Sequence, residues 1–261
     1  MPEGHTIHRL ARDHQRWFAG QSVLCLSPQG RFEGEAQKIS GRALRRVTAH
    51  GKHLFYHFTS RTLIHVHLGL YGKFRVHRNP AGPPRGAVRW RMTGQERTFD
   101  LNGPNRCELI DGRGYQSVIK RLGEDPLQPD ADADRVWERW RRSRAAVGSI
   151  LLNQAVVAGV GNVYRAEVLF DAGVDPRRPG KELSREECEW IWDRLVEWLA
   201  VGVKYNRIIT AEPPEDKPRS RMNREERLMC YKKRLCTWCE SPVSNWELGG
   251  RTIYACLECQ T

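Results

Sequence analysis

The sequence lacks several features that would each indicate a class of protein. It has no run of about 18 apolar residues, the length that a membrane-spanning helix needs, so we expect no transmembrane segment. Its first residues, MPEGHTIHRLARDH, lack the apolar core of a signal peptide, which predicts a cytoplasmic protein. The P-loop, GxSxG and HExxH motifs are missing, so nothing in the sequence indicates the chemistry that those motifs perform. No internal repeat is found.

Acidic residues are outnumbered by basic ones. The 261 residues include 43 Lys and Arg against 31 Asp and Glu, which gives a formal net charge of +12. Clustered basic side chains gain affinity for a polyanion because they release counterions from its phosphates. The charge therefore predicts a phosphate-bearing polyanionic partner.

Cysteine is sparse in most of the chain and concentrated at its end. Four of the eight cysteines lie within the last 26 residues, in two CxxC pairs that sixteen residues separate: Cys236, Cys239, Cys256 and Cys259. This spacing predicts a zinc ribbon with a β-hairpin around ELGG, and its metal would be structural because four thiolates leave no open position. A pair of redox disulfides is the alternative. The remaining cysteines are expected to be buried apolar residues: Cys25, Cys107, Cys188 and Cys230.

The first half of the chain has the pattern of a β protein. Residues 20–120 contain short runs of β-branched and aromatic residues, broken by Gly, Asn and Pro. A helix is expected before them over residues 6–18, where apolar residues recur at helical spacing. The three prolines of residues 78–86 predict a loop.

The pattern changes after residues 123–134, an acidic, proline-bearing segment typical of an interdomain linker. Helices are predicted over DRVWERWRRS, VGSILLNQAVV and residues 184–203, the last with a capping box of Ser184 and Glu187. Residues 211–228 have almost no apolar content and are expected to form an exposed loop.

Three further features of the sequence have more than one interpretation. GVGN, at residues 159–162, predicts a tight turn whose Asn162 starts a helix and could bind phosphate, or it is a plain connection between helices. Lys52 precedes an alternating strand, as a functional lysine or a solvated one. His65 and His67 share one face of a strand, but no carboxylate or cysteine has matching spacing, so a metal site is not favoured.

The chain start, Pro2 followed by Glu3, also has two interpretations. Proline at this position can be accidental. Alternatively, Met1 is removed and Pro2 has a free secondary amine that can react.

Taken together, five motifs resemble one family. PEG, GKHL, HLGLYG, GVGNVYRAEVLF and a four-cysteine ribbon ending CLECQT resemble, in this order and over nearly the whole chain, the formamidopyrimidine-DNA glycosylase and endonuclease VIII group. These proteins are bifunctional enzymes of DNA repair. PEG rather than PEL is similar to the endonuclease VIII branch, and PEGHT to its actinobacterial members.

The resemblance implies an α+β fold and an activity. The fold would have a β-sandwich lobe with a leading helix over residues 1–123, a helix–two-turns–helix lobe over residues 132–225, and a finger with one structural Zn²⁺ over residues 226–261. The activity would be that of a base-excision-repair glycosylase and abasic-site lyase, which removes oxidised pyrimidines. Its partner would be damaged double-stranded DNA, bound by a monomer in the bacterial cytoplasm at the nucleoid.

The resemblance also implies catalytic residues. Pro2, with Met1 removed, would be the nucleophile that attacks C1′ of the damaged nucleotide. Glu3 would be the acid and base, and Lys52 would contact phosphate and assist the lyase step. Arg251, in the finger hairpin, would grip the phosphates beside the lesion and assist δ-elimination.

Four DNA-binding residues follow from the same resemblance. Asn162 would bind phosphate in the helix–two-turns–helix motif, and Arg121 is matched to another arginine that contacts DNA. Leu70 and Tyr71 would fill the space that the extruded base leaves.

The sequence departs from the family pattern at two positions. Gly69 replaces a glutamine of the void-filling turn, and Thr6 replaces a second N-terminal glutamate. A non-catalytic DNA-binding relative is the alternative function, although four residues that match the family argue against it: Pro2, Glu3, Lys52 and Arg251. A zinc-ribbon transcription or RNA-processing factor would explain the finger and the charge but not the chain start.

Overall fold

The computed structural model describes residues 2–59 and 61–261 and separates them into two compact units. The first unit consists of Ile7–Arg121 with the residues before Gly4, and the second consists of Gly4–Thr6 with Leu122–Thr261. The expected removal of Met1 concerns a residue outside the described ones. The expected bounds of three domains stay a prediction.

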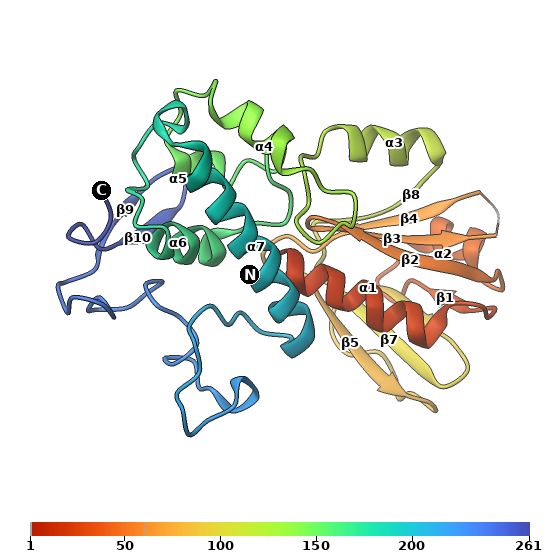
Figure 1. The fold of residues 1–261 in the computed structure, drawn as a ribbon. Coiled ribbons are helices and arrows are strands. Elements are labelled where there is room, and N and C mark those ends of the chain that lie inside the picture. Colours follow the sequence, from red (N-terminus) through yellow and green to blue (C-terminus); the bar gives the residue numbers. More distant parts are fainter. Residues whose placement is uncertain (1, 60) are drawn as a thin grey trace. The chain divides into compact units, whose positions relative to one another are not determined.

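Two four-stranded antiparallel sheets form the sandwich of the first unit (Figure 1). One sheet has the strand order β1-β6-β7-β5 and the other has the order β2-β3-β4-β8. The strands are β1 (Leu24–Leu26), β2 (Leu44–His50), β3 (His53–Phe58), β4 (Leu63–His67), β5 (Lys73–Arg78), β6 (Val88–Thr93), β7 (Arg97–Asn102) and β8 (Arg106–Ile110). The helices are α1 (Gly4–Phe18), α2 (Glu33–Ile39) and α3 (Gly112–Lys120).

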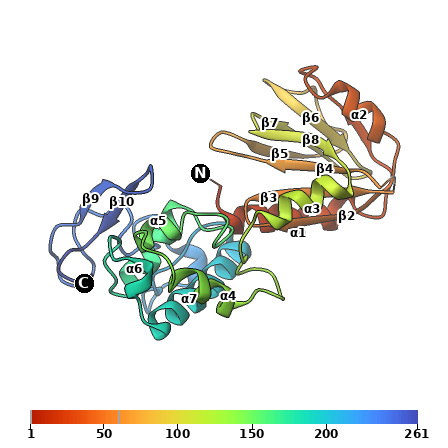
Figure 2. The ribbon, with the colours of Figure 1, turned by 90° about the horizontal axis from the view of Figure 1, so that it is seen from above.

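Strand β3 shows how the sequence divides the two faces of its sheet. Leu54, Tyr56 and Phe58 belong to the core that the two sheets and α1 share. Because successive side chains of a strand point to opposite faces, the residues between them face away from this core. On that outer face α3 lies near β4 and β8 (Figure 2), and Tyr115 packs edge-on against Phe55 with 5.0 Å between ring centroids.

The second unit is helical and ends in a hairpin. Its elements are α4 (Ala133–Trp140), α5 (Val147–Ile150), α6 (Asn162–Asp171), α7 (Arg185–Tyr205), β9 (Ser244–Glu247) and β10 (Thr252–Ala255), with 3-10 turns at Gly180–Glu182 and Arg219–Arg221. Helix α7 begins at the predicted capping box, in which Glu187 N–H donates to Ser184 Oγ and Ser184 N–H donates to Glu187 Oε2. No helix in the described part of the chain is long and apolar enough to cross a membrane.

Helix prediction was wrong in two places. The expected helix over VGSILLNQAVV is only the single turn of α5, because Asn153 forms an Asx turn instead. Its side-chain oxygen accepts from Ala155 N–H at 3.0 Å and its carbonyl accepts from Val156 N–H at 2.8 Å, bonds that compete with the helix. Helices α2 and α3 were not predicted within the β-rich half.

The predicted linker is fastened within the second unit. Gly123 N–H donates to Gln154 O at 2.8 Å, and Ala158 N–H donates to Glu124 O at 2.8 Å. The side chain of Asp125 is almost fully buried. The acidic segment therefore holds the turn that precedes α6 instead of acting as a loose tether.

Candidate active site

The chain start is held in place by the residue that follows Glu3. Gly4 N–H donates to Gly159 O at 2.8 Å, in the turn before α6. A Cβ on Gly4 would lie 2.9 Å from Gly159 Cα, closer than real side chains approach, so glycine is the residue that fits. Glu3 itself is fully buried at the N-terminal end of α1, and Pro2 is half-buried. Burying a carboxylate is costly unless it is paired, which makes Glu3 a candidate functional residue.

Lys52 lies in the turn that joins β2 to β3. Gly51, before it, has φ +55°, a backbone conformation that favours glycine. Lys52 is half-buried. The sequence placed this lysine at the edge of a strand, and the structure places it one residue before β3.

Leu70 and Tyr71 project from the turn between β4 and β5. Gly72 N–H donates to Leu68 O at 3.0 Å and closes the turn. The two side chains remain 52% and 84% exposed. Two adjacent large apolar side chains with this exposure are available to a partner.

The structure accounts for the surroundings of the two positions that depart from the family pattern, Gly69 and Thr6. Gly69 has φ +66°, and a Cβ there would lie 2.8 Å from Asn105 Cβ, so a glutamine would be strained. Thr6 Oγ1 lies 3.1 Å from His5 Nε2, within hydrogen-bond distance. Burial lowers the pKa of His5 to about 4, so this imidazole is neutral near pH 7.

Asn162 is the first residue of α6, as predicted, and its side chain is bound within the protein. Its amide Nδ2 donates to Thr252 O of β10 at 2.8 Å, and its Oδ1 accepts from Arg165 Nη2 at 2.5 Å. The side chain is 7% exposed as part of this contact. It therefore links α6 to the hairpin, and its expected phosphate contact stays a prediction.

Arg165 organises the finger hairpin, and the sequence analysis missed it. It is fully buried, and its guanidinium donates to the carbonyls of Gly148, Leu248 and Arg251. These bonds fix the loop that joins β9 to β10, from which the exposed side chain of Arg251 extends. The available signal was a pair of charged residues, Arg165 and Glu167, within GVGNVYRAEVLF, whose other residues are mostly apolar.

Glu167, two residues further along α6, was also missed by the sequence analysis. Its Oε2 accepts from Met229 N–H at 2.7 Å and from the hydroxyl of Thr210. Its Oε1 accepts from Cys230 N–H at 2.9 Å and from Tyr231 N–H at 2.6 Å. One buried carboxylate thus holds the segment that leads into the four-cysteine cluster.

The four C-terminal cysteines come together as predicted. Their sulfur atoms all lie within 4.8 Å of one another, with 3.8 Å between Cys236 and Cys259 and 3.5 Å between Cys239 and Cys256. A tetrahedral Zn²⁺ with Zn–S bonds of about 2.3 Å requires sulfurs about 3.8 Å apart, whereas a disulfide is about 2.0 Å long. The cluster fits one structural zinc ion. The other four cysteines are free, and all but the half-buried Cys107 are buried, as expected.

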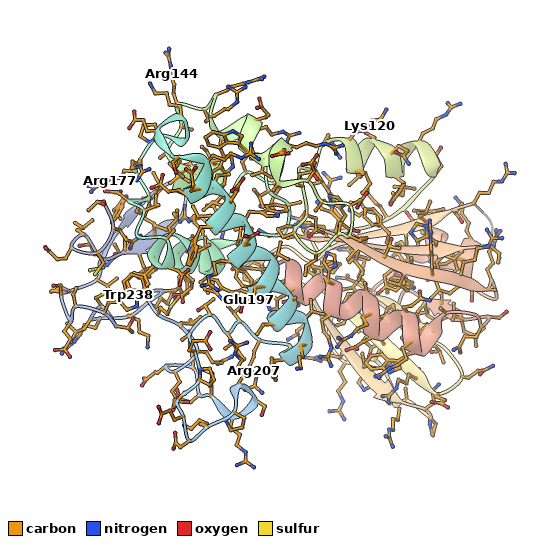
Figure 3. The ribbon with its side chains drawn as sticks, in the orientation of Figure 1. Lys120, Arg144, Arg177, Glu197, Arg207 and Trp238 are labelled. Carbon is orange, nitrogen blue, oxygen red and sulfur yellow. The ribbon has the colours of Figure 1, made fainter. Side chains whose placement is uncertain are left out.

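The finger is packed and hydrogen-bonded against the rest of the second unit. Trp238, labelled in Figure 3, lies against Phe170 of α6 with 4.3 Å between ring centroids. Gln260 Oε1 accepts from Cys256 N–H and its Nε2 donates to Val174 O, both at 2.9 Å. The finger therefore packs on α6 through Trp238 and is bonded through Gln260 to the segment that follows α6.

Arg121 lies exposed at the end of α3, where its Nε donates to Ser117 O at 3.1 Å. Together with Arg113 and Lys120 it lines an open hollow of about 510 Å³. Its role in DNA contact stays a prediction.

Comparison with family models identifies both halves of the chain. Residues 1–112 match the model described as the formamidopyrimidine-DNA glycosylase N-terminal domain. Residues 122–213 match the formamidopyrimidine-DNA glycosylase H2TH domain. Together the two models cover well over half of the sequence.

Relatives and solved structures agree with these matches. "Endonuclease 8 1" of Mycobacterium tuberculosis is 44% identical, and the match covers 100% of both chains. "Formamidopyrimidine-DNA glycosylase" of Thioalkalivibrio sulfidiphilus is 31% identical, again over 100% of both chains. In fold the chain is similar to Lactococcus lactis Fpg in a complex with N7-benzyl-Fapy-dG-containing DNA, with a TM-score of 0.83, 22% identity and 99% of each chain covered.

Proposed function

The chain belongs to the formamidopyrimidine-DNA glycosylase family, whose members are DNA glycosylases and abasic-site lyases, and from this premise we propose that Pro2 is its nucleophile and oxidised pyrimidines are its substrates. The observation that carries the proposal is the fully buried carboxylate of Glu3 at a chain start that Gly4 fastens to the turn before α6. A terminus held in this way can present a reactive amine in one position.

The proposed chemistry starts with the secondary amine of Pro2, after Met1 has been removed. An N-terminal amine titrates near pH 8, so a useful fraction is unprotonated at pH 7. Its nitrogen attacks C1′ while the bond from C1′ to the damaged base breaks, and Glu3 protonates the ring oxygen as the sugar opens.

The resulting iminium ion has no N–H proton to lose, so it persists as an electron sink. Loss of a C2′ proton then expels the 3′ phosphate by β-elimination, and δ-elimination expels the 5′ phosphate. Hydrolysis of the iminium returns the free amine. Lys52 and Arg251 would bind the phosphates on either side during these steps.

Leu70 and Tyr71 would enter the duplex where the base has been extruded. Their exposure on a closed turn between two strands suits this role, since a fixed apolar wedge compensates part of the lost stacking. The identity of 44% with "Endonuclease 8 1" agrees with the resemblance to endonuclease VIII, and that resemblance implies oxidised pyrimidines as substrates. A DNA substrate would place the protein in the bacterial cytoplasm at the nucleoid.

The test is borohydride trapping on duplexes that contain thymine glycol or an abasic site. The protein used should have a Pro2 terminus verified by mass spectrometry. A covalent adduct is expected, and a version that retains Met1 should give none. Verified protein that binds the lesion but forms no adduct would contradict the assignment of Pro2 and would favour a non-catalytic DNA-binding protein.

Glu3→Gln separates the two catalytic roles. It should retain lesion binding but lose base excision, because an amide cannot donate the proton that the opening sugar needs. Thr6→Ser is a matched control in the same helix turn and should retain excision.

A further inference from the structure

The outer face of the β2-β3-β4-β8 sheet carries a cluster of histidines that the proposed chemistry does not use. His53 of β3 stands opposite His67 of β4, and His65 stands opposite Glu108 of β8. The rings of His53 and His65 are stacked, with 5.0 Å between centroids and 18° between planes, and His67 lies 4.9 Å from His53.

Three of these side chains form a hydrogen-bonded line. Glu108 Oε1 lies 2.9 Å from His65 Nδ1, and His65 Nε2 lies 2.8 Å from His53 Nδ1. His65 is 1% exposed, so both of its ring nitrogens are used inside the protein.

The line fixes where each proton sits, because the histidines in it are neutral. Burial lowers the pKa of His53 to about 3 and that of His67 to about 4, and it lowers the pKa of His65 as well. A neutral imidazole has one N–H, and the carboxylate of Glu108 can only accept. His65 must then donate from Nδ1 and accept at Nε2, and His53 must donate from its own Nδ1.

The consequence is a fixed acceptor at the far end of the line. His53 is left with an unprotonated Nε2, one residue after Lys52 in the chain. Lys52 is close enough to help lower the pKa of His67. The other cations that act on these rings are Arg106 of β8 and Arg121 after α3, and His50 of β2 faces His53.

The cluster is not arranged as a metal site. A spacing of 2.8 Å between the nitrogens of His53 and His65 is a hydrogen bond, whereas two nitrogens on one Zn²⁺ would stand about 3.3 Å apart. Among the described residues, only the cysteine cluster brings three or more potential metal ligands close together.

We propose that Glu108 and His65 are positioning residues that hold His53 as its Nδ1–H tautomer, so that His53 Nε2 is a fixed hydrogen-bond acceptor next to the His67 ring during abasic-site cleavage. The role in cleavage rests on the function proposed above, and the tautomer assignment does not. Each residue of the line acts through the next, as in other sites where a carboxylate orients a histidine.

The tautomers can be read directly in the intact protein. Long-range ¹H–¹⁵N spectra of ¹⁵N-labelled protein at pH 7 distinguish the two ring nitrogens of each histidine. Nδ1–H forms are expected for both His53 and His65. An Nε2–H form or a protonated ring at either residue would overturn the line.

Cleavage of a preformed abasic duplex under single-turnover conditions tests the role. Glu108→Leu should slow cleavage about five- to tenfold, the effect of losing one fixed hydrogen bond, while the Kd for the duplex changes less than twofold. Glu108→Gln, whose amide oxygen can still accept from His65, should restore most of the rate. His77→Leu is the matched control, since His77 pairs with Asp100 at 3.1 Å on the other sheet.

The outcomes separate the two proposals. The expected tautomers together with an unchanged rate in Glu108→Leu would overturn the positioning role alone. If Glu108→Leu does not fold, Glu108→Gln must keep the Nδ1–H form at His53, and its absence would overturn the line. Wild-type protein without any cleavage would refute the proposed function and the positioning role, whereas the tautomer spectra would still test the line.

Discussion

Replacing Glu167 by glutamine tests how the zinc hairpin is attached to α6. The carboxylate accepts three backbone N–H groups and the hydroxyl of Thr210, two bonds at each oxygen. Glutamine keeps one acceptor oxygen and places an NH₂ group where the other oxygen was. That group faces at least one backbone N–H, so two donors meet in a buried place.

The magnitude follows from these contacts. A hydrogen bond to a charged group contributes about 1.5–3 kcal/mol, and a buried donor left without a partner costs about 1–3 kcal/mol. Thr210 can rotate its hydroxyl to accept from the new amide, which limits the loss. We expect the free energy of unfolding to fall by about 2–4 kcal/mol, which corresponds to a melting temperature lower by about 5–15 °C for a chain of this size.

Two measurements check this prediction. Calorimetry gives the melting temperature, and a metallochromic dye gives the rate of zinc release in the presence of a chelator, which should rise in Glu167→Gln. The control is Glu197→Gln, which removes a partly exposed ion pair in which Arg194 Nη1 lies 2.9 Å from Glu197 Oε2; Glu197 is labelled in Figure 3. Such a solvent-accessible pair contributes less than about 1 kcal/mol. If Glu167→Gln melts and releases zinc like Glu197→Gln, the carboxylate does not hold the hairpin.

Four further predictions follow from single residues. Gly4→Ala forces a Cβ against the Gly159 backbone and should destabilise the protein by about 1–3 kcal/mol in urea unfolding; unchanged stability would contradict the close approach. Burial lowers the pKa of His14 to about 3, so the unfolded chain takes up its proton first and stability should fall as the pH drops from about 6.5 towards 3, by up to about 1.4 kcal/mol per pH unit. Acid denaturation of His14→Phe should show a smaller slope. Cys239→Ser should lose zinc by mass spectrometry and bind DNA more weakly by anisotropy, and full affinity would refute the finger's role. Arg251→Ala should weaken both DNA binding and strand cleavage and reduce the slope of log Kd against log salt by about 1; an unchanged slope would argue against a phosphate contact.

Much of the fold was predictable where local chemistry decides the structure. The capping box of Ser184 and Glu187 fixed the start of α7, and the two CxxC pairs predicted both the cluster and its hairpin. The leading helix was also predicted, two residues short at its start. In each case the signal lies within a few residues and needs no tertiary partner.

The rest depends on contacts between residues far apart in the chain. The Asx turn of Asn153 and the helix that it replaces are both compatible with the local sequence, and the bond from Gly123 N–H to Gln154 O, between residues 31 positions apart, favours the turn. The apolar neighbours of Arg165 show that this residue is unusual. They do not show which three carbonyl groups it binds. The same holds for His65, whose partner Glu108 lies 43 residues away.

The anchors of the finger have a consequence for how this protein can be recombined. Asn162, Arg165 and Glu167 fall within six consecutive residues of α6, and together they bind the hairpin, its loop and the segment that leads into it. A chimera that exchanges residues 226–261 alone would leave these side chains facing a foreign backbone. One that moves α6 with the finger would keep the bonds of Asn162 and Arg165 to the hairpin and its loop, and those of Glu167 to residues 229–231. The segment to exchange with the finger is therefore larger than residues 226–261, because it includes α6 from Asn162 onward.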